Sequence, residues 1–127
     1  MRRVAQEAPP IAGYAAGLVG RIRREFEQRE REAGTIRQRV TEATRALVAR
    51  FEVRRVWLFG SLAWGGVHEE SDVDLLVEGL TADLWDDADA FLEERIGLPV
   101  DLVRREEASP GLVERVSAMG VLLYDRS

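Results

Sequence analysis

Residues 60–79 read GSLAWGGVHEESDVDLLVEG, a glycine-serine turn followed by two aspartates and an apolar run. Two aspartates, Asp72 and Asp74, flank Val73 at the point where an apolar run begins. Successive side chains of a strand point to opposite faces, so both carboxylates leave one face of the predicted strand while Val73 faces the core. Like charges this close repel unless a cation or a hydrogen-bond donor compensates them. The stretch therefore predicts a strand whose start carries a compensated pair of negative charges.

A third carboxylate, Asp101, lies inside the apolar run 99–103, where an isolated charge would be costly. If this run forms a strand beside the one at 73–77, Asp101 converges on Asp72 and Asp74. Oxygen ligands of this kind suit Mg²⁺ or Mn²⁺. Two such ions can bridge the attacking and leaving oxygens of a phosphoryl or nucleotidyl transfer. We therefore predict that Asp72, Asp74 and Asp101 hold metal ions for a transfer of this kind.

The pair Gly60–Ser61 at the head of the stretch is predicted to bind nucleotide phosphates. Glycine lets the backbone approach a ligand closely, and consecutive N–H groups and a serine hydroxyl at a helix start can hold phosphate. A lone Gly-Ser pair or a lone D-x-D is common in turns and strand edges. The spacing G-S-x10-D-x-D, with flanking strands and a third aspartate within a strand, is much more selective.

In the first part of the chain, apolar residues recur with the period of an α-helix. An apolar residue recurs every fourth position on one helical face, at Tyr14, Leu18, Ile22 and Phe26. We predict that this helix runs to about Glu32 and ends at Gly34 in a left-handed cap. Thr35, with Gln38 three residues on, predicts the start of a second helix, which continues to about Phe51.

From Val53 onward strands alternate with helices, which predicts an α/β domain. The expected strands are four short apolar runs at 56–59, 73–77, 100–103 and 121–124. We expect one helix from an Asp83 cap to about Ile96, ended by Gly97, and another from the Ser109 cap and Pro110 to about Ala118.

Composition excludes several classes of protein. The 127 residues suit one domain with a single core, and the absence of cysteine excludes disulfides, zinc thiolate sites and thiol nucleophiles. The N-terminal region lacks the apolar core of a signal peptide, and its longest apolar stretch, 11–19, is broken by glycines. We therefore expect no membrane segment and a cytoplasmic location.

Charge is divided unevenly along the chain, in which all 18 basic residues are arginine. Residues 1–50 carry eleven Arg against six Glu, whereas residues 51–127 carry seven Arg against seventeen Asp and Glu. The acidic second part argues against nucleic-acid binding unless metal ions offset its charge. The basic first part could meet an acidic partner, although a solvated charged helix is the favoured interpretation.

The residues named above resemble the minimal nucleotidyltransferase (MNT) group of the DNA polymerase β superfamily. The resemblance is carried by Leu58-Phe59-Gly60-Ser61, Ala63, Gly65, Ser71-Asp72-x-Asp74-Leu75 and Val100-Asp101-Leu102. It covers roughly residues 36–124 and implies an α/β (α+β) fold, a small mixed sheet with helices packed against it. Residues 1–34 would then form an N-terminal tail and amphipathic helix, a helical extension of the nucleotidyltransferase domain at 35–127.

The resemblance also implies roles for the site residues. Gly60 and Ser61 would cradle a nucleoside triphosphate, and Asp72 and Asp74 would bind both metal ions. Asp101 would complete one metal site and help activate the incoming hydroxyl. ATP would be the nucleotide donor, Mg²⁺ or Mn²⁺ the cofactor, and pyrophosphate the leaving group.

Many members of this group are antitoxins encoded beside HEPN-domain ribonucleases, which they silence by transferring AMP to a tyrosine. A HEPN toxin is therefore the expected partner. The single histidine, His68, has no arginine at the upstream spacing of the HEPN R-x4–6-H motif, so this chain is not itself a HEPN protein. Two alternatives stay open: a catalytically impaired antitoxin that acts by stoichiometric binding, and a nucleotidyltransferase that modifies a small molecule.

Trp64 departs from the pattern of the group, whereas three other features have ordinary explanations. Members of the group often have arginine or lysine where Trp64 stands, so Trp64 removes a cation from the predicted phosphate loop and could stack on a base or partner instead. His68 is expected to be an exposed loop residue, and Trp57 and Phe59 are expected to pack in the core. The acidic residues between Asp83 and Asp89 are explained by the dipole of a helix start.

Overall fold

The computed structural model describes residues 10–64 and 72–126, with the side chains from residue 17 onward except Trp64. Contacts divide the chain into two units, Met1–Glu32 and Ala33–Ser127. In the first unit the described residues are all helical. The second unit holds a sheet and its covering helices, and His68, Gly65 and Ser71 fall outside the described residues.

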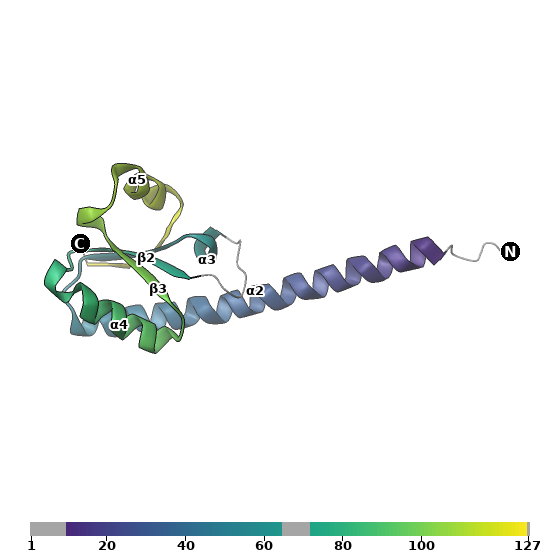
Figure 1. The fold of residues 1–127 in the computed structure, drawn as a ribbon, viewed down its shortest axis with the longest axis horizontal. Coiled ribbons are helices and arrows are strands. Elements are labelled where there is room, and N and C mark those ends of the chain that lie inside the picture. The colour runs from purple at the N-terminus through teal and green to yellow at the C-terminus, as the bar shows by residue number, and fades with distance from the viewer. Residues whose placement is uncertain (1–9, 65–71, 127) are drawn as a thin grey trace. The chain divides into compact units, whose positions relative to one another are not determined.

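The second unit is built on a four-stranded mixed sheet (Figure 1). Its strands are β1 (Arg55–Phe59), β2 (Val73–Glu78), β3 (Val100–Arg104) and β4 (Val121–Asp125), in the spatial order β3-β2-β1-β4. β1 pairs antiparallel with β2 and β4, whereas β2 and β3 are parallel. The predicted mixed sheet and all four predicted strands are confirmed.

Helices cover both faces of the sheet. α2 (Pro10–Arg50), which continues into the second unit, and α4 (Trp85–Ile96) contribute Val40, Leu47 and Leu92 to the larger core cluster. α5 (Pro110–Met119) covers the opposite face, where its Val116 packs with Phe59 and Leu76. Both faces of β2 are therefore buried, as a central strand requires.

The short elements and caps follow from local sequence. Ser109 caps α5, since its hydroxyl accepts from the Leu112 N–H at 3.2 Å, and Gly97 ends α4 in the left-handed conformation. The predicted Asp83 cap is wrong, because Asp83 lies inside a 3-10 turn, η1 (Ala82–Leu84), that leads into α4. The remaining elements are α3 (Ser61–Trp64) and the 3-10 turn η2 (Arg105–Glu107).

The predicted helix end at Gly34 is also wrong, because α2 runs without a break through that position. Residues on one face, Ala33, Val40, Ala43 and Leu47, are buried at helical spacing. Gly34 is exposed beside this face and a Cβ there would meet nothing within 4 Å. A glycine in a helix interior costs only about 1 kcal/mol relative to alanine. Burial of the neighbouring apolar face easily offsets that cost.

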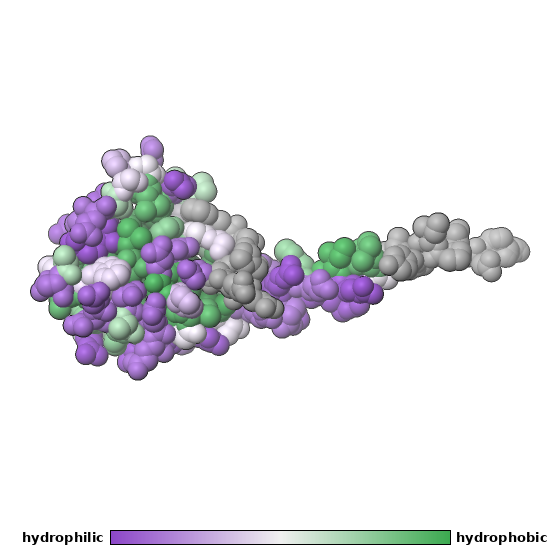
Figure 2. Space-filling model, in the orientation of Figure 1, coloured by the Kyte–Doolittle hydropathy of each residue, from purple (hydrophilic) through white to green (hydrophobic). Residues whose placement is uncertain are grey.

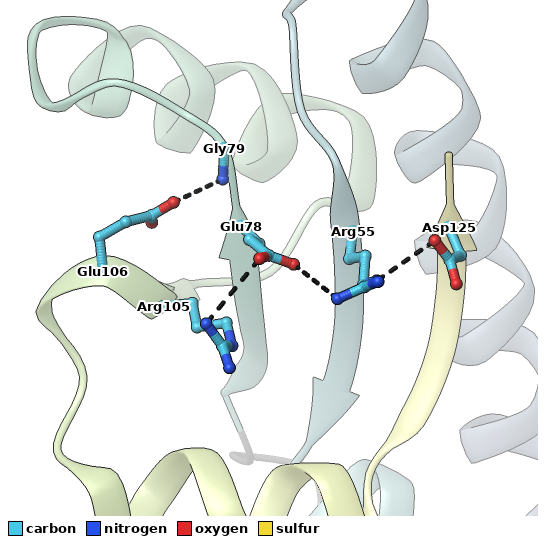
Figure 3. A network of polar contacts seen from close by, with 6 residues as sticks. All are labelled: Arg55, Glu78, Gly79, Arg105, Glu106 and Asp125. Atoms are coloured by element: carbon cyan, nitrogen blue, oxygen red, sulfur yellow. Dashed lines mark hydrogen bonds and ion pairs between the residues drawn. The ribbon is translucent and has the colours of Figure 1, made fainter. Parts of the chain in front are cut away.

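Charged side chains join the strands at the sheet end where β2 finishes (Figure 3). Arg55 Nη1 lies 3.2 Å from Glu78 Oε1, and Arg55 Nε lies 3.2 Å from Asp125 Oδ1. Arg105 Nη1 is 3.8 Å from the other Glu78 oxygen, and the Gly79 N–H donates to Glu106 Oε2 at 2.8 Å. This network joins β1, β2, β4 and η2 at the opposite end of the β1–β2 pair from Asp74.

The exposed part of α2 carries apolar residues among charged ones (Figure 2). Leu18, Val19, Ile22 and Phe26 are 41–62% exposed. Among the described residues, none of the helices has the length and apolar character needed to cross a membrane.

Gly34→Ala should stabilise the protein by about 0.5–1 kcal/mol, because alanine loses less backbone entropy in a helix interior. Thermal unfolding followed by circular dichroism measures the change. Gly97→Ala is the matched control and should destabilise, since Gly97 has a φ of 81°. A lower Tm for Gly34→Ala would contradict the continuous helix and favour a left-handed cap at this position.

Candidate active site

The predicted carboxylates lie where β2 and β3 begin. The parallel register pairs Asp74 with Asp101, and the Val73 N–H donates to the Pro99 carbonyl at 3.0 Å. Alternation along the strands puts Asp74 on the face of buried Leu76, which α5 covers, away from the larger core cluster. Asp72 immediately precedes β2 and is exposed, as is Asp101, whereas Asp74 is half-buried.

Gly60 lies directly against Asp74. The antiparallel register pairs Phe59 with Asp74, and Gly60 follows Phe59 with a φ of 78°. A Cβ on Gly60 would come within 2.9 Å of the Asp74 carboxyl carbon and would clash with its Oδ2. Glycine is therefore required here for two reasons, the left-handed backbone and the close approach of a carboxylate.

The next residue, Ser61, begins α3 and is half-buried. This single helical turn is held by the Ala63 N–H, which donates to the Gly60 carbonyl at 3.1 Å. Arg37 of α2 also donates, through Nε, to the Leu62 carbonyl at 3.1 Å. The turn after β1 is thus anchored to α2, which leaves Gly60 and Ser61 beside the carboxylates.

The environment of Asp74 disfavours its charge. Burial, and after it the neighbouring charges of Asp101 and Asp72, together raise its pKa from the ordinary 3.8 to about 6. At neutral pH the group is mostly ionised and lies in the negative field of two other carboxylates. A bound cation would relieve this repulsion.

The side chains of the three predicted aspartates are chemically suited to bind a divalent cation. Asp72, Asp74 and Asp101 offer oxygen ligands only, which Mg²⁺ and Mn²⁺ prefer. In the described part of the chain, however, no three acidic, histidine or cysteine side chains are close enough to form a ready ligand set. The three aspartates interact electrostatically without closing around a shared point, and residues 65–71, which lead into Asp72, are not described.

Sequence reasoning missed the residues that hold the backbone of this site. No role in the site was assigned to Arg37, Trp85 or Glu93. Yet the Trp85 indole Nε1 donates to the Leu102 carbonyl at 2.7 Å, and the Glu93 carboxylate accepts from the Val100 N–H at 3.0 Å. No local pattern signals a bond from a side chain to a distant backbone group.

Other predicted residues are placed as follows. Phe59 is buried and Trp57 packs partly against the same small cluster, so their predicted core role is confirmed. Trp64 ends α3, and its side chain is not described. Burial raises the pKa of Asp89, with further contributions from the charges of Glu93, Asp86 and Asp101.

A small mixed sheet that carries carboxylates at the start of its central strand, beside a glycine turn, defines a nucleotidyltransferase domain. The polymerase β nucleotidyltransferase family matches residues 42–127 of this chain. The chain therefore belongs to the polymerase β nucleotidyltransferase family, and it is a nucleotidyltransferase.

Relatives support this assignment. The chain is 36% identical over 80 residues to the protein adenylyltransferase MntA of Thermococcus cleftensis, a match that covers 61% of this chain and 81% of that protein. A solved structure described as a minimal nucleotidyltransferase is 37% identical, with a TM-score of 0.61 over 70% of this chain and 93% of its own. A crystal structure of a toxin–antitoxin with AMP-PNP is 25% identical, with a TM-score of 0.61 over 68% and 74%.

Gly60→Ala should reduce nucleotidyl transfer by about 100-fold, because the new Cβ displaces the Asp74 carboxylate by a substantial fraction of an ångström. Initial rates with radiolabelled ATP measure the effect. Gly111→Ala is the control, since a Cβ at Gly111 meets nothing within 4 Å. Transfer at the wild-type rate in Gly60→Ala would show that Asp74 is not needed in this position.

Asp74→Asn should stabilise the metal-free protein at high pH. The folded-state pKa of about 6 lies above the ordinary value of 3.8, so ionisation opposes folding. This cost is absent well below pH 4, grows as the pH rises to about 6, and is complete above it. After allowance for solvent screening, the free energy of unfolding of the variant should exceed that of the wild type by about 1 kcal/mol at about pH 8.

Differential scanning fluorimetry between about pH 4 and pH 8 tests this, with Asp83→Asn, an exposed position, as the control. The gain in Tm should vanish at the acid end. Addition of Mg²⁺ at about pH 8 should raise the Tm of the wild type more than that of Asp74→Asn. An equal response of both proteins to Mg²⁺ would exclude Asp74 as a ligand.

Proposed function

We propose that this nucleotidyltransferase is the antitoxin of a HEPN ribonuclease toxin and that it transfers AMP from ATP to a tyrosine hydroxyl of that toxin. The observation that carries the proposal is the register that puts Asp74 beside both Asp101 and Gly60. The likeness to an MntA adenylyltransferase and to a toxin–antitoxin structure that contains AMP-PNP supports the choice of donor and partner. The tyrosine acceptor rests on the resemblance to the MNT group.

In the proposed reaction the acceptor oxygen attacks the α-phosphorus of ATP. The bond between this phosphorus and the oxygen that bridges to the β-phosphate breaks, and pyrophosphate leaves with the electron pair. Asp101, exposed at the start of β3, would accept the proton of the attacking hydroxyl. Gly60 leaves room for the Asp74 carboxylate, and the Ser61 hydroxyl would donate a hydrogen bond to the phosphates.

Asp72, Asp74 and Asp101 would hold Mg²⁺ or Mn²⁺. When bound, the metal supplies positive charge at the phosphate oxygens. In the metal-free protein the pKa of Asp74 is about 6, so protons compete with the metal for this carboxylate in acid. Transfer should therefore fall in acid as this ligand becomes protonated.

A second candidate is an antitoxin that acts by stoichiometric binding. The exposed apolar residues of α2, Leu18, Val19, Ile22 and Phe26, favour it because they offer a contact surface. The two candidates differ in what each requires: transfer requires the aspartates, whereas stoichiometric binding requires the surface.

Incubation of the chain with the protein encoded by the adjacent gene, Mg²⁺ and ATP labelled at the α-phosphate should transfer label to a tyrosine. The double variant Asp72→Asn/Asp74→Asn should transfer label at least about 100-fold more slowly, because the site loses the negative charge and the ligand oxygens of both aspartates. Mass spectrometry of the acceptor identifies the modified side chain.

A neutralisation assay in cells separates the candidates. If the double aspartate variant still neutralises the partner while Leu18→Ser/Phe26→Ser does not, the protein acts by binding and the proposal of AMP transfer fails. Glu27→Ser, an exposed change on the same helix, is the control for the surface variant.

A further inference from the structure

β3 is one of the two edge strands of the sheet, next to β2 on one side only. Its other side faces α4 side chains. The Trp85 Nε1–H donates to the Leu102 carbonyl at 2.7 Å, and the Val100 N–H donates to Glu93 Oε2 at 3.0 Å. α4 thus supplies, with two side chains, the hydrogen bonds that a neighbouring strand would otherwise supply.

These two bonds flank Asp101. One reaches the residue before it and the other the residue after it, and Asp101 itself is the partner of Asp74 in the β2–β3 register. On the β2 side, the bond from the Val73 N–H to the Pro99 carbonyl holds the same strand start. The backbone of Asp101 is therefore held from both sides of the strand, although its own side chain is exposed.

Asp89 of α4 lies midway between Trp85 and Glu93, four residues from each. Residues four apart share one face of a helix, so all three lie along β3. One Asp89 oxygen is buried and has no hydrogen-bond partner among the described residues. Among the described residues, Trp85 and Glu93 are the members of this row whose bonds to the strand are established.

We propose that Trp85 and Glu93 are positioning residues that hold Asp101 opposite Asp74 and thereby set the affinity of the site for its divalent cation. The inference rests on the proposed metal-dependent transfer and adds α4 to the machinery of that site. An edge strand with one free side can shift along or away from its neighbour. Side-chain bonds on either side of Asp101 restrict that shift at the position where it would separate two ligands.

Electron paramagnetic resonance of Mn²⁺ bound to the full chain tests the inference. The measurement uses an ATP analogue with a methylene group between the α- and β-phosphorus atoms, which binds without turnover. Trp85→Phe removes the N–H donor and keeps an aromatic ring, and Glu93→Ala removes the acceptor. Each should weaken Mn²⁺ affinity by about 10-fold, the effect expected when a ligand loses its support. Glu93→Gln retains an acceptor oxygen and should recover most of the affinity.

Glu94→Ala is the matched control, since Glu94 is an exposed neighbour of the same charge on α4. Circular dichroism confirms that each variant is folded at the assay temperature. Mn²⁺ affinity within about 2-fold of wild type in both Trp85→Phe and Glu93→Ala would overturn the inference, as would an equal loss in Glu94→Ala. A lower Tm with unchanged affinity would likewise assign these bonds to stability alone.

The wild type separates this inference from the function on which it rests. If the wild-type chain does not bind Mn²⁺ with the analogue, the proposed function and the inference both fail. If it binds, and Asp74→Asn abolishes binding while Trp85→Phe and Glu93→Ala do not weaken it, the inference alone fails.

Discussion

The pairing of β2 on both sides is the constraint on which the rest of the structure depends. Its antiparallel pairing with β1 brings Gly60 against Asp74, and its parallel pairing with β3 brings Asp101 beside the same residue. Parallel strands need a crossover, and α4 supplies it between β2 and β3. One strand therefore determines where the turn, the carboxylates and the crossover helix must lie.

This arrangement makes the site unfavourable in the absence of a cation. A half-buried carboxylate lies among two others, and its pKa is raised to about 6. The same strand carries Leu75, Leu76 and Val77, which are almost wholly buried. Burial of each such side chain contributes about 1.5–3 kcal/mol, enough to offset the repulsion at Asp74. The sheet thus tolerates a charged strand start that a less buried strand would not hold in place.

Much of the fold and of the candidate site could be predicted from residues close together in the chain. The strand runs, the Ser109 cap and the Gly97 helix end follow from local periodicity and cap chemistry, and the structure agrees with each. One error arose where burial outweighed a local signal, and the other arose at a turn that precedes a helix. At Gly34 the buried face that includes Ala33 and Val40 carries the helix through a residue that ends many helices. Asp83 can cap a helix, but the chain forms a 3-10 turn there first.

The amino-acid sequence alone set the types of residue and their spacing: a Gly-Ser pair, two aspartates after ten intervening residues, and one aspartate within a later strand. That Asp72 and Asp74 share one face follows from the short-range rule that side chains alternate along a strand. Only the tertiary structure decided that Gly60 lies against Asp74, that Asp101 is its partner, and that Trp85 and Glu93 hold the strand around Asp101. Such contacts join residues far apart in the chain, and their geometry depends on how the whole core packs.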